Sequence, residues 1–256
     1  MEIFDSHSHL DDARFDDDRD EIVIRAKENG VKYILNPGAT LASSVKAVKI
    51  AEKYDIVYAA VGIHPHDVKD MDENTIAVLK SLCKRDKVVA YGEIGLDYYY
   101  NHSSKELQRK WFKRQIELAK ELKLPIIVHD RDAHGEVFDI LKEYKVWEDG
   151  CVMHCYSGSV ELAKEYVKKG IYISLAGPLT FKNAKKTQAV AKEIPLEWLM
   201  AETDAPYLTP VPFRGKRNEP SYTKYIVEAI AKAKEIDLEK TAMKLTANTK
   251  KFLGLI

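Results

Sequence analysis

Short apolar runs alternate along this chain with longer charged stretches in which apolar residues recur at helical spacing. Continuous apolar runs are typical of strands buried on both faces of a parallel sheet. Successive runs are separated by roughly thirty residues, which leaves room for one helix and two short loops each time. Eight such runs are present, at residues 3–9, 33–37, 57–63, 88–96, 126–129, 152–156, 172–175 and 199–203.

Several of the intervening stretches carry helix signals. Residues 16–29 open with acidic side chains, which favour a helix N-terminus, and stop at Asn29-Gly30. Residues 103–124 repeat apolar side chains at helical spacing until Pro125 ends the pattern. Residues 221–253 predict two helices separated near Ile236-Asp237. The alternation of strand and helix signals predicts an α/β fold, a TIM (β/α)8 barrel.

The length agrees with that fold, because 256 residues match the roughly 250 of a typical eight-fold βα barrel. Two small domains would also fit this length. Since no low-complexity linker divides the chain, we favour a single domain over residues 1–256. The 40 basic and 40 acidic residues give no overall positive field to attract nucleic acid. A polyanion would therefore be held by a local basic patch or by metal.

The first residues lack the basic start and apolar core of a secretion signal, and no run of 18 apolar residues occurs. We expect a soluble cytoplasmic protein without a membrane partner, and we favour a monomer. Cys151 and Cys155 flank His154 and resemble part of a zinc cluster, but no second Cys or His pair follows at finger spacing. Together with Cys83 they are expected to be ordinary thiols.

Candidate chemistry gathers where the predicted strands end, which is where TIM barrels carry their functional residues. Six of the eight histidines lie at these junctions. His7 and His9 are two residues apart on the first predicted strand, so their side chains should face the same way and make half of a metal site. A hydrogen-bonded histidine pair without metal is the alternative. The other strand ends supply His64, Glu93, His129, His154 and Asp204.

Imidazole and carboxylate ligands suit zinc, manganese or iron. Four histidines and two carboxylates exceed the needs of one tetrahedral ion, whereas two ions sharing a bridging carboxylate would use all six. Glu93 is the natural bridge because it is long and comes from a central strand. The first and last strands are neighbours in a closed barrel, so one ion would be held by His7, His9 and Asp204. The other would be held by His129 and His154.

The charge of this site predicts its substrate. Two divalent ions against Glu93 and Asp204 leave a surplus of two positive charges, which favours a bridging hydroxide and an anionic ligand such as a phosphate ester. Paired ions roughly 3.5 to 4 Å apart lower the pKa of a bridging water and bind both the attacking and the leaving oxygen. Asp204 would also accept the proton of that water as general base.

At these residues the chain resembles the TatD family of metal-dependent deoxyribonucleases, which belong to the amidohydrolase-like TIM barrels. The similarity covers essentially the whole length and is carried by residues 5–10, 62–66, 92–97, 125–133, 154–158, 203–208 and 214–220. The resemblance implies two divalent ions, of Zn, Mg or Mn, and hydrolysis of DNA phosphodiesters, with single-stranded or frayed DNA as substrate. It implies His64 as a contact to the substrate phosphate and the following metal ligands: His7, His9, Glu93, His129, His154 and Asp204.

Basic and aromatic residues near these loops are candidate substrate contacts. Arg131, Arg214 and Arg217 would bind backbone phosphates, although residues 214–220 are also typical of a salt-bridged loop that fastens the last turn. The tyrosines at 98–100 would stack on unpaired bases or simply pack the loop.

Two alternative functions remain. The same dinuclear site would also serve a hydrolase of amides, esters or lactones, because the fold and ligands do not define the scissile bond. A non-catalytic metal- or nucleic-acid-binding protein is the alternative from another class. The complete ligand set with a general base argues against it, as does the neutral net charge.

Overall fold

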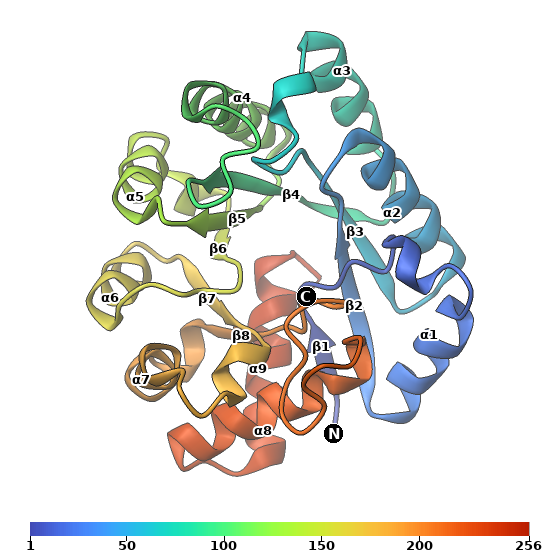
Figure 1. The fold of residues 1–256 in the computed structure, drawn as a ribbon, viewed down its shortest axis with the longest axis vertical. Coiled ribbons are helices and arrows are strands. Elements are labelled where there is room, and N and C mark those ends of the chain that lie inside the picture. The colour runs from blue at the N-terminus through green and yellow to red at the C-terminus, as the bar shows by residue number, and fades with distance from the viewer. Residues whose placement is uncertain (256) are drawn as a thin grey trace. The chain divides into compact units, whose positions relative to one another are not determined.

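The computed structural model describes residues 1–255, in which eight strands alternate with helices (Figure 1). The strands are β1 (Ile3–Asp5), β2 (Val31–Pro37), β3 (Val57–Val61), β4 (Val88–Asp97), β5 (Ile126–Arg131), β6 (Cys151–Met153), β7 (Tyr172–Leu175) and β8 (Leu199–Ala201). The α-helices are α1 (Arg19–Glu28), α2 (Leu41–Lys53), α3 (Glu73–Leu82), α4 (Lys105–Leu122), α5 (His134–Glu143), α6 (Val160–Lys168), α7 (Lys185–Glu193), α8 (Thr223–Lys234) and α9 (Leu238–Phe252).

The strands form one eight-stranded sheet in the order β1-β2-β3-β4-β5-β6-β7-β8. This sequential order with alternating helices confirms the predicted TIM (β/α)8 fold class. The chain forms two compact units, the first from Met1–Asn36 and Cys155–Ile256 and the second from Pro37–His154. A single domain over residues 1–256 stays a prediction.

In the first unit, strands from the two ends of the chain lie side by side. β7 pairs with β8 and β1 pairs with β2, both in parallel. The Ser6 N–H donates to the Ala201 carbonyl at 3.1 Å, and Ser8 forms a parallel bridge with Ala205. α9 packs against both β1 and β8 (Figure 1). The predicted adjacency of the first and last strands is therefore confirmed.

In the second unit, β3 to β6 pair in sequence and in parallel. Gly95 pairs with His129 across β4 and β5. Its φ is 150°, and a Cβ there would lie 1.9 Å from the His129 carbonyl oxygen. Only glycine allows this close approach, which brings the site-bearing ends of the two strands together.

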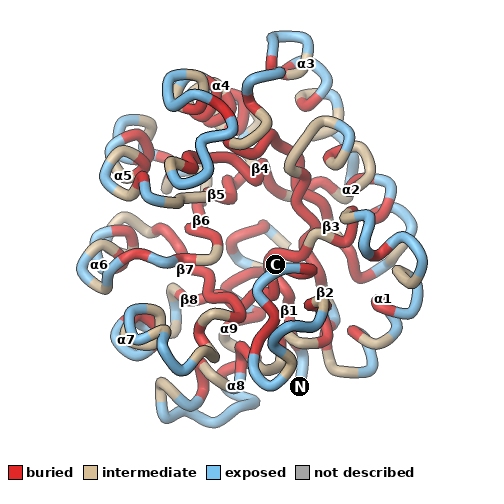
Figure 2. Tube along the Cα trace, viewed as in Figure 1, coloured by how far each residue is buried: buried red, intermediate tan, exposed pale blue. Residues whose placement is uncertain are grey.

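The strands are buried along most of their length, whereas the helices alternate between buried and exposed positions (Figure 2). This is the pattern that the continuous apolar runs predicted. Four strands end earlier than predicted: β1 at Asp5, β3 at Val61, β6 at Met153 and β8 at Ala201. The predicted strand ends at His9, Ile63, Tyr156 and Thr203 are wrong, because the residues that follow each of these strands leave the sheet and enter loops.

A substitution of Phe112 on α4 tests how much the core of the second unit contributes to stability. Phe112 is fully buried, and α4 packs against β4. We expect Phe112→Ala to lower the free energy of unfolding by about 3–5 kcal/mol, because it removes buried surface and leaves a cavity. Urea denaturation measures the loss. Val78→Ala on α3, where the side chain is 42% exposed, is the control and should change stability by less than about 1 kcal/mol.

Candidate metal centre

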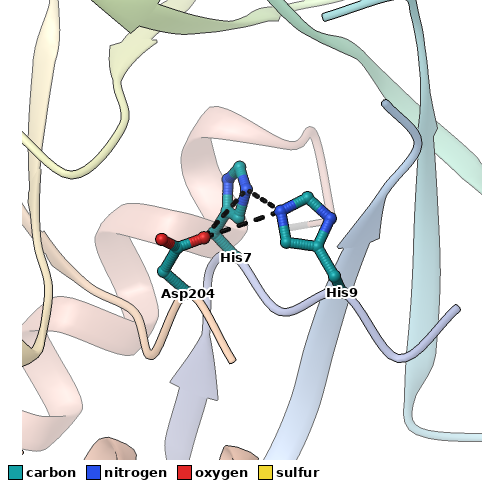
Figure 3. A group of neighbouring side chains, drawn as sticks. All are labelled: His7, His9 and Asp204. Carbon is teal, nitrogen blue, oxygen red and sulfur yellow. Dashed lines mark hydrogen bonds and ion pairs between the residues drawn. The ribbon is translucent and has the colours of Figure 1, made fainter. Parts of the chain in front are cut away.

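The first unit brings His7, His9 and Asp204 together (Figure 3). The Nε2 atoms of His7 and His9 are 3.2 Å apart. Asp204 Oδ1 lies 3.5 Å from His9 Nε2 and 3.9 Å from His7 Nε2. His7 is fully buried, and the three donor atoms all lie within 4.8 Å of one another. The two histidines meet although both lie beyond the end of β1.

Buried polar contacts support the backbone around this cluster. The Asp5 carboxylate accepts hydrogen bonds from Thr203 N–H at 2.8 Å and Thr203 Oγ1 at 2.6 Å, and a longer one from His7 N–H at 3.4 Å. Complete burial raises the pKa of Asp5 to about 8, although these hydrogen bonds oppose the shift. Asp5 thus joins the backbone of His7 to Thr203, the residue before Asp204.

A second buried side chain, Asn218, shapes the loop that carries Asp204. Its amide donates to the Thr203 carbonyl at 2.8 Å and to the Tyr207 carbonyl at 2.6 Å. Asp204 itself has a φ of 55°, and its N–H donates to the His7 carbonyl at 2.9 Å. Asn218 was not among the site residues predicted from the sequence. Its only sequence signal is an amide residue inside a basic loop, which does not reveal that the side chain is buried.

The second unit gathers three imidazoles around Glu93. Glu93 Oε1 lies 2.8 Å from His129 Nδ1, 3.6 Å from His64 Nε2 and 3.6 Å from His154 Nε2. These residues come from β4, β5 and the loops that follow β3 and β6. The structure thus places His64, which the sequence assigned to substrate phosphate, at the same carboxylate as His129 and His154. Burial also holds the pKa of His64 well below its usual value, so the ring is neutral.

Asp97 connects this cluster to the surface loop after β4. Asp97 Oδ2 lies 3.1 Å from His129 Nε2 and 2.9 Å from His66 Nε2. Asp97 Oδ1 accepts the N–H groups of Tyr99 and Tyr100 at 3.1 and 2.9 Å. His129 Nδ1 is thereby directed toward Glu93 while Nε2 faces a supporting carboxylate, the arrangement found behind metal-bound histidines.

Both clusters suit a divalent cation by the chemistry of their donors. Each combines imidazole nitrogens with a carboxylate oxygen, the set that zinc and manganese prefer. Burial lowers the pKa of His129, but the carboxylates of Asp97 and Glu93 on either side outweigh burial and raise it to about 9. The space between His129 and Glu93 therefore attracts positive charge, and a metal ion would replace the proton.

Asp97→Asn tests the support of His129. We expect metal affinity and any metal-dependent activity to fall by about 10- to 100-fold, because the variant loses the charge that holds the His129 ring in place. Titration of metal-stripped protein with Mn²⁺ and Zn²⁺ measures the affinity. An affinity equal to that of the wild type would show that His129 needs no such support.

The candidate substrate arginines have different surroundings. Arg217 forms a paired contact with the Asp18 carboxylate and also donates to the Arg14 carbonyl, as expected of the salt-bridged loop. The guanidinium of Arg214 lies 4.1 Å from the centre of the Phe181 ring. That of Arg131 lies against the rings of the loop after β4.

An eight-stranded βα fold that carries histidine and carboxylate clusters at and just beyond the ends of its strands is typical of metal-dependent hydrolases. The family model described as "TatD related DNase" matches residues 4–254. The chain belongs to this family, as the sequence motifs predicted.

Known relatives agree with this classification. The chain is 49% identical to the "Uncharacterized metal-dependent hydrolase YabD" of Bacillus subtilis, over 99% of each chain. It is 35% identical to the "3'-5' ssDNA/RNA exonuclease TatD" of Cronobacter sakazakii, over 90% of this chain and 89% of the relative. The crystal structure of the TatD homologue YjjV from Escherichia coli superimposes with a TM-score of 0.93 at 31% identity, over 98% of each chain.

Among residues 1–255, no helix is both long enough and apolar enough to cross a membrane.

Proposed function

We propose that this protein is a nuclease that uses divalent metal to hydrolyse phosphodiester bonds in single-stranded or frayed DNA. The observation that carries the proposal is the Glu93 carboxylate, which faces three imidazoles within 3.6 Å. Such a buried set of donors serves metal chemistry and contributes little to a hydrophobic core. The relative named as a single-stranded DNA and RNA exonuclease supports a nucleic-acid substrate.

We assign one divalent ion, of Zn, Mg or Mn, to each cluster. His7, His9 and Asp204 would hold the first ion. Glu93 would hold the second together with His129 and His154, whose ring nitrogens lie 2.8 and 3.6 Å from its Oε1 atom. Bound there, the ions would lower the pKa of a water molecule and neutralise charge on phosphate oxygens. That both ions act on the same phosphodiester is an inference from family membership.

The residues of the chain have separate tasks in this proposal. Asp204 accepts a proton from the attacking water, since its carboxylate is only 13% exposed and lies beside two imidazoles. His64 is neutral and lies next to Glu93, where one ring nitrogen can donate to a phosphate oxygen. Arg131, Arg214 and Arg217 are the candidate contacts to flanking phosphates. Of these, Arg217 is already engaged by Asp18.

We propose that the protein is a cytoplasmic monomer. No disulfide joins Cys83, Cys151 or Cys155, as a reducing compartment favours.

Metal removal and add-back test the proposal. Protein stripped with chelator is supplied with Mg²⁺, Mn²⁺ or Zn²⁺, and nucleotide release is measured from single-stranded DNA, single-stranded RNA and blunt duplex. We expect metal-dependent release from single-stranded DNA that exceeds release from the duplex. If the loaded protein leaves all three substrates intact, the nuclease assignment is wrong and amides, esters and lactones become the substrates to test.

A further inference from the structure

The loop after β4 presents two tyrosine rings to solvent beside the Glu93 cluster. Tyr99 is 58% exposed and Tyr100 is 50% exposed. Their backbone N–H groups donate to Asp97 Oδ1, and the other oxygen of this carboxylate faces His129 Nε2. The two rings are therefore exposed and yet held at a defined place next to a candidate metal ligand.

The guanidinium of Arg131 lies against these two rings and carries a positive charge. Its guanidinium carbon lies 4.1 Å from the centre of the Tyr99 ring and 4.7 Å from that of Tyr100. No carboxylate in the described part of the chain forms an ion pair with Arg131, in contrast to Arg217, which is paired with Asp18. Aromatic faces hold a guanidinium without neutralising it, so its charge stays available to an anion.

Further rings connect the tyrosines to the metal cluster. The Tyr100 and His102 rings are stacked, with centroids 5.6 Å apart and planes 7° from parallel. The His66 ring lies 5.5 Å from Tyr100 and 6.3 Å from His129. The rings of His129, His66 and Tyr100 thus form a series that leads from a candidate metal ligand to the surface. A chain of flat bases linked by phosphates is the kind of ligand that matches this series.

We propose that Tyr99, Tyr100 and Arg131 form a nucleotide subsite next to the scissile phosphate. An unpaired base stacks on the tyrosine rings, and Arg131 binds a phosphate of that nucleotide. The inference rests on the proposed nuclease function and deepens it, because it selects the form of the substrate. Bases of a duplex are already stacked on one another, so this subsite accepts only a single strand or an unpaired end.

Photocrosslinking tests the subsite without requiring hydrolysis. Full-length protein in chelator is mixed with single-stranded DNA carrying 5-iodo-2′-deoxyuridine near its 3′ end, irradiated, and mapped by peptide mass spectrometry. We expect crosslinks at Tyr99 or Tyr100 that disappear in the Tyr99→Leu/Tyr100→Leu double variant. Tyr144→Leu, at the C-terminal end of α5, is the matched control and should leave the crosslinks in place. Crosslinks found only outside residues 98–102, or none at all, overturn the subsite.

Binding measurements separate stacking from charge. In the double tyrosine variant we expect the dissociation constant for single-stranded DNA to rise by about 10- to 100-fold. An abasic nucleotide at the crosslinked position should raise the dissociation constant of the wild type to the same extent. It should leave the dissociation constant of the double tyrosine variant unchanged. Arg131→Gln should reduce the salt dependence of binding, whereas Arg85→Gln, which removes a surface partner of Glu52, should not. Equal weakening of wild type and double variant by the abasic nucleotide would contradict stacking.

The two assays together distinguish the subsite from the nuclease proposal. Crosslinking at the tyrosines without cleavage in any metal would support the subsite and refute the nuclease function. Metal-dependent cleavage with crosslinks only elsewhere would support the nuclease function and refute the subsite.

Discussion

Glu93→Gln is expected to reduce metal-dependent hydrolysis of single-stranded DNA by about 10³-fold or more while the protein remains folded. The substitution keeps the size of the side chain but removes the negative charge that faces His64, His129 and His154. Loss of a metal ion removes several kcal/mol of transition-state stabilisation, and each 1.36 kcal/mol corresponds to a tenfold change in rate. Initial rates at saturating Mn²⁺ measure the effect, and metal analysis of the dialysed protein shows whether one ion has been lost.

Glu121→Gln is the matched control for this variant. Glu121 is exposed on α4 and pairs with Lys80 at the surface of the same unit. We expect wild-type rates and wild-type metal content. Near-normal activity of Glu93→Gln would remove Glu93 from the proposed site.

Asp204→Asn is expected to lower kcat by about 10²- to 10⁴-fold, the usual contribution of a general base. An amide retains an oxygen that can face His7 and His9, but it cannot accept a proton from water. The rate–pH profile gives the specific signature: the acidic limb of the wild-type profile should disappear in the variant. The profile is measured with single-stranded DNA at saturating metal.

Asp149→Asn provides the control for Asp204, since Asp149 forms a surface ion pair with Lys120. Its rate and pH profile should match those of the wild type. The opposite outcome is also defined. Asp204→Asn could lose its metal and, once metal is restored at high concentration, still show the acidic limb in its rate–pH profile. Asp204 would then be a metal ligand, and another group would be the general base.

Much of the fold was predictable because parallel strands buried on both faces produce continuous apolar runs. The meeting of His7 and His9 with Asp204 followed from the adjacency of the first and last strands, which the structure confirms. The meeting of Glu93 with His129 followed in the same way from neighbouring strands. Strand order therefore determines which side chains meet within each unit. That they bind metal is part of the proposed function.

The supporting contacts were not predictable because they depend on irregular backbone. Asn218 donates to the Thr203 carbonyl next to Asp204, whose φ of 55° lies in the left-handed region. The ion pair of Arg217 with Asp18 joins positions that no strand pattern relates. The contact of Asp97 Oδ2 with His129 Nε2, at 3.1 Å, is likewise not contained in the apolar pattern of the two strands. Loop conformation, rather than hydrophobic pattern, determines each of these contacts.

The two units bring their candidate metal donors together over different lengths of chain. Glu93, His129 and His154 all lie in one continuous segment, Pro37–His154. His7 and His9 come from one segment of the first unit, Met1–Asn36, and Asp204 comes from the other, Cys155–Ile256. Closing a longer loop costs more chain entropy, and this cost grows slowly with the length of the loop. The first cluster therefore depends on closing a loop that spans the second unit, whereas the second cluster depends only on closure within its own segment.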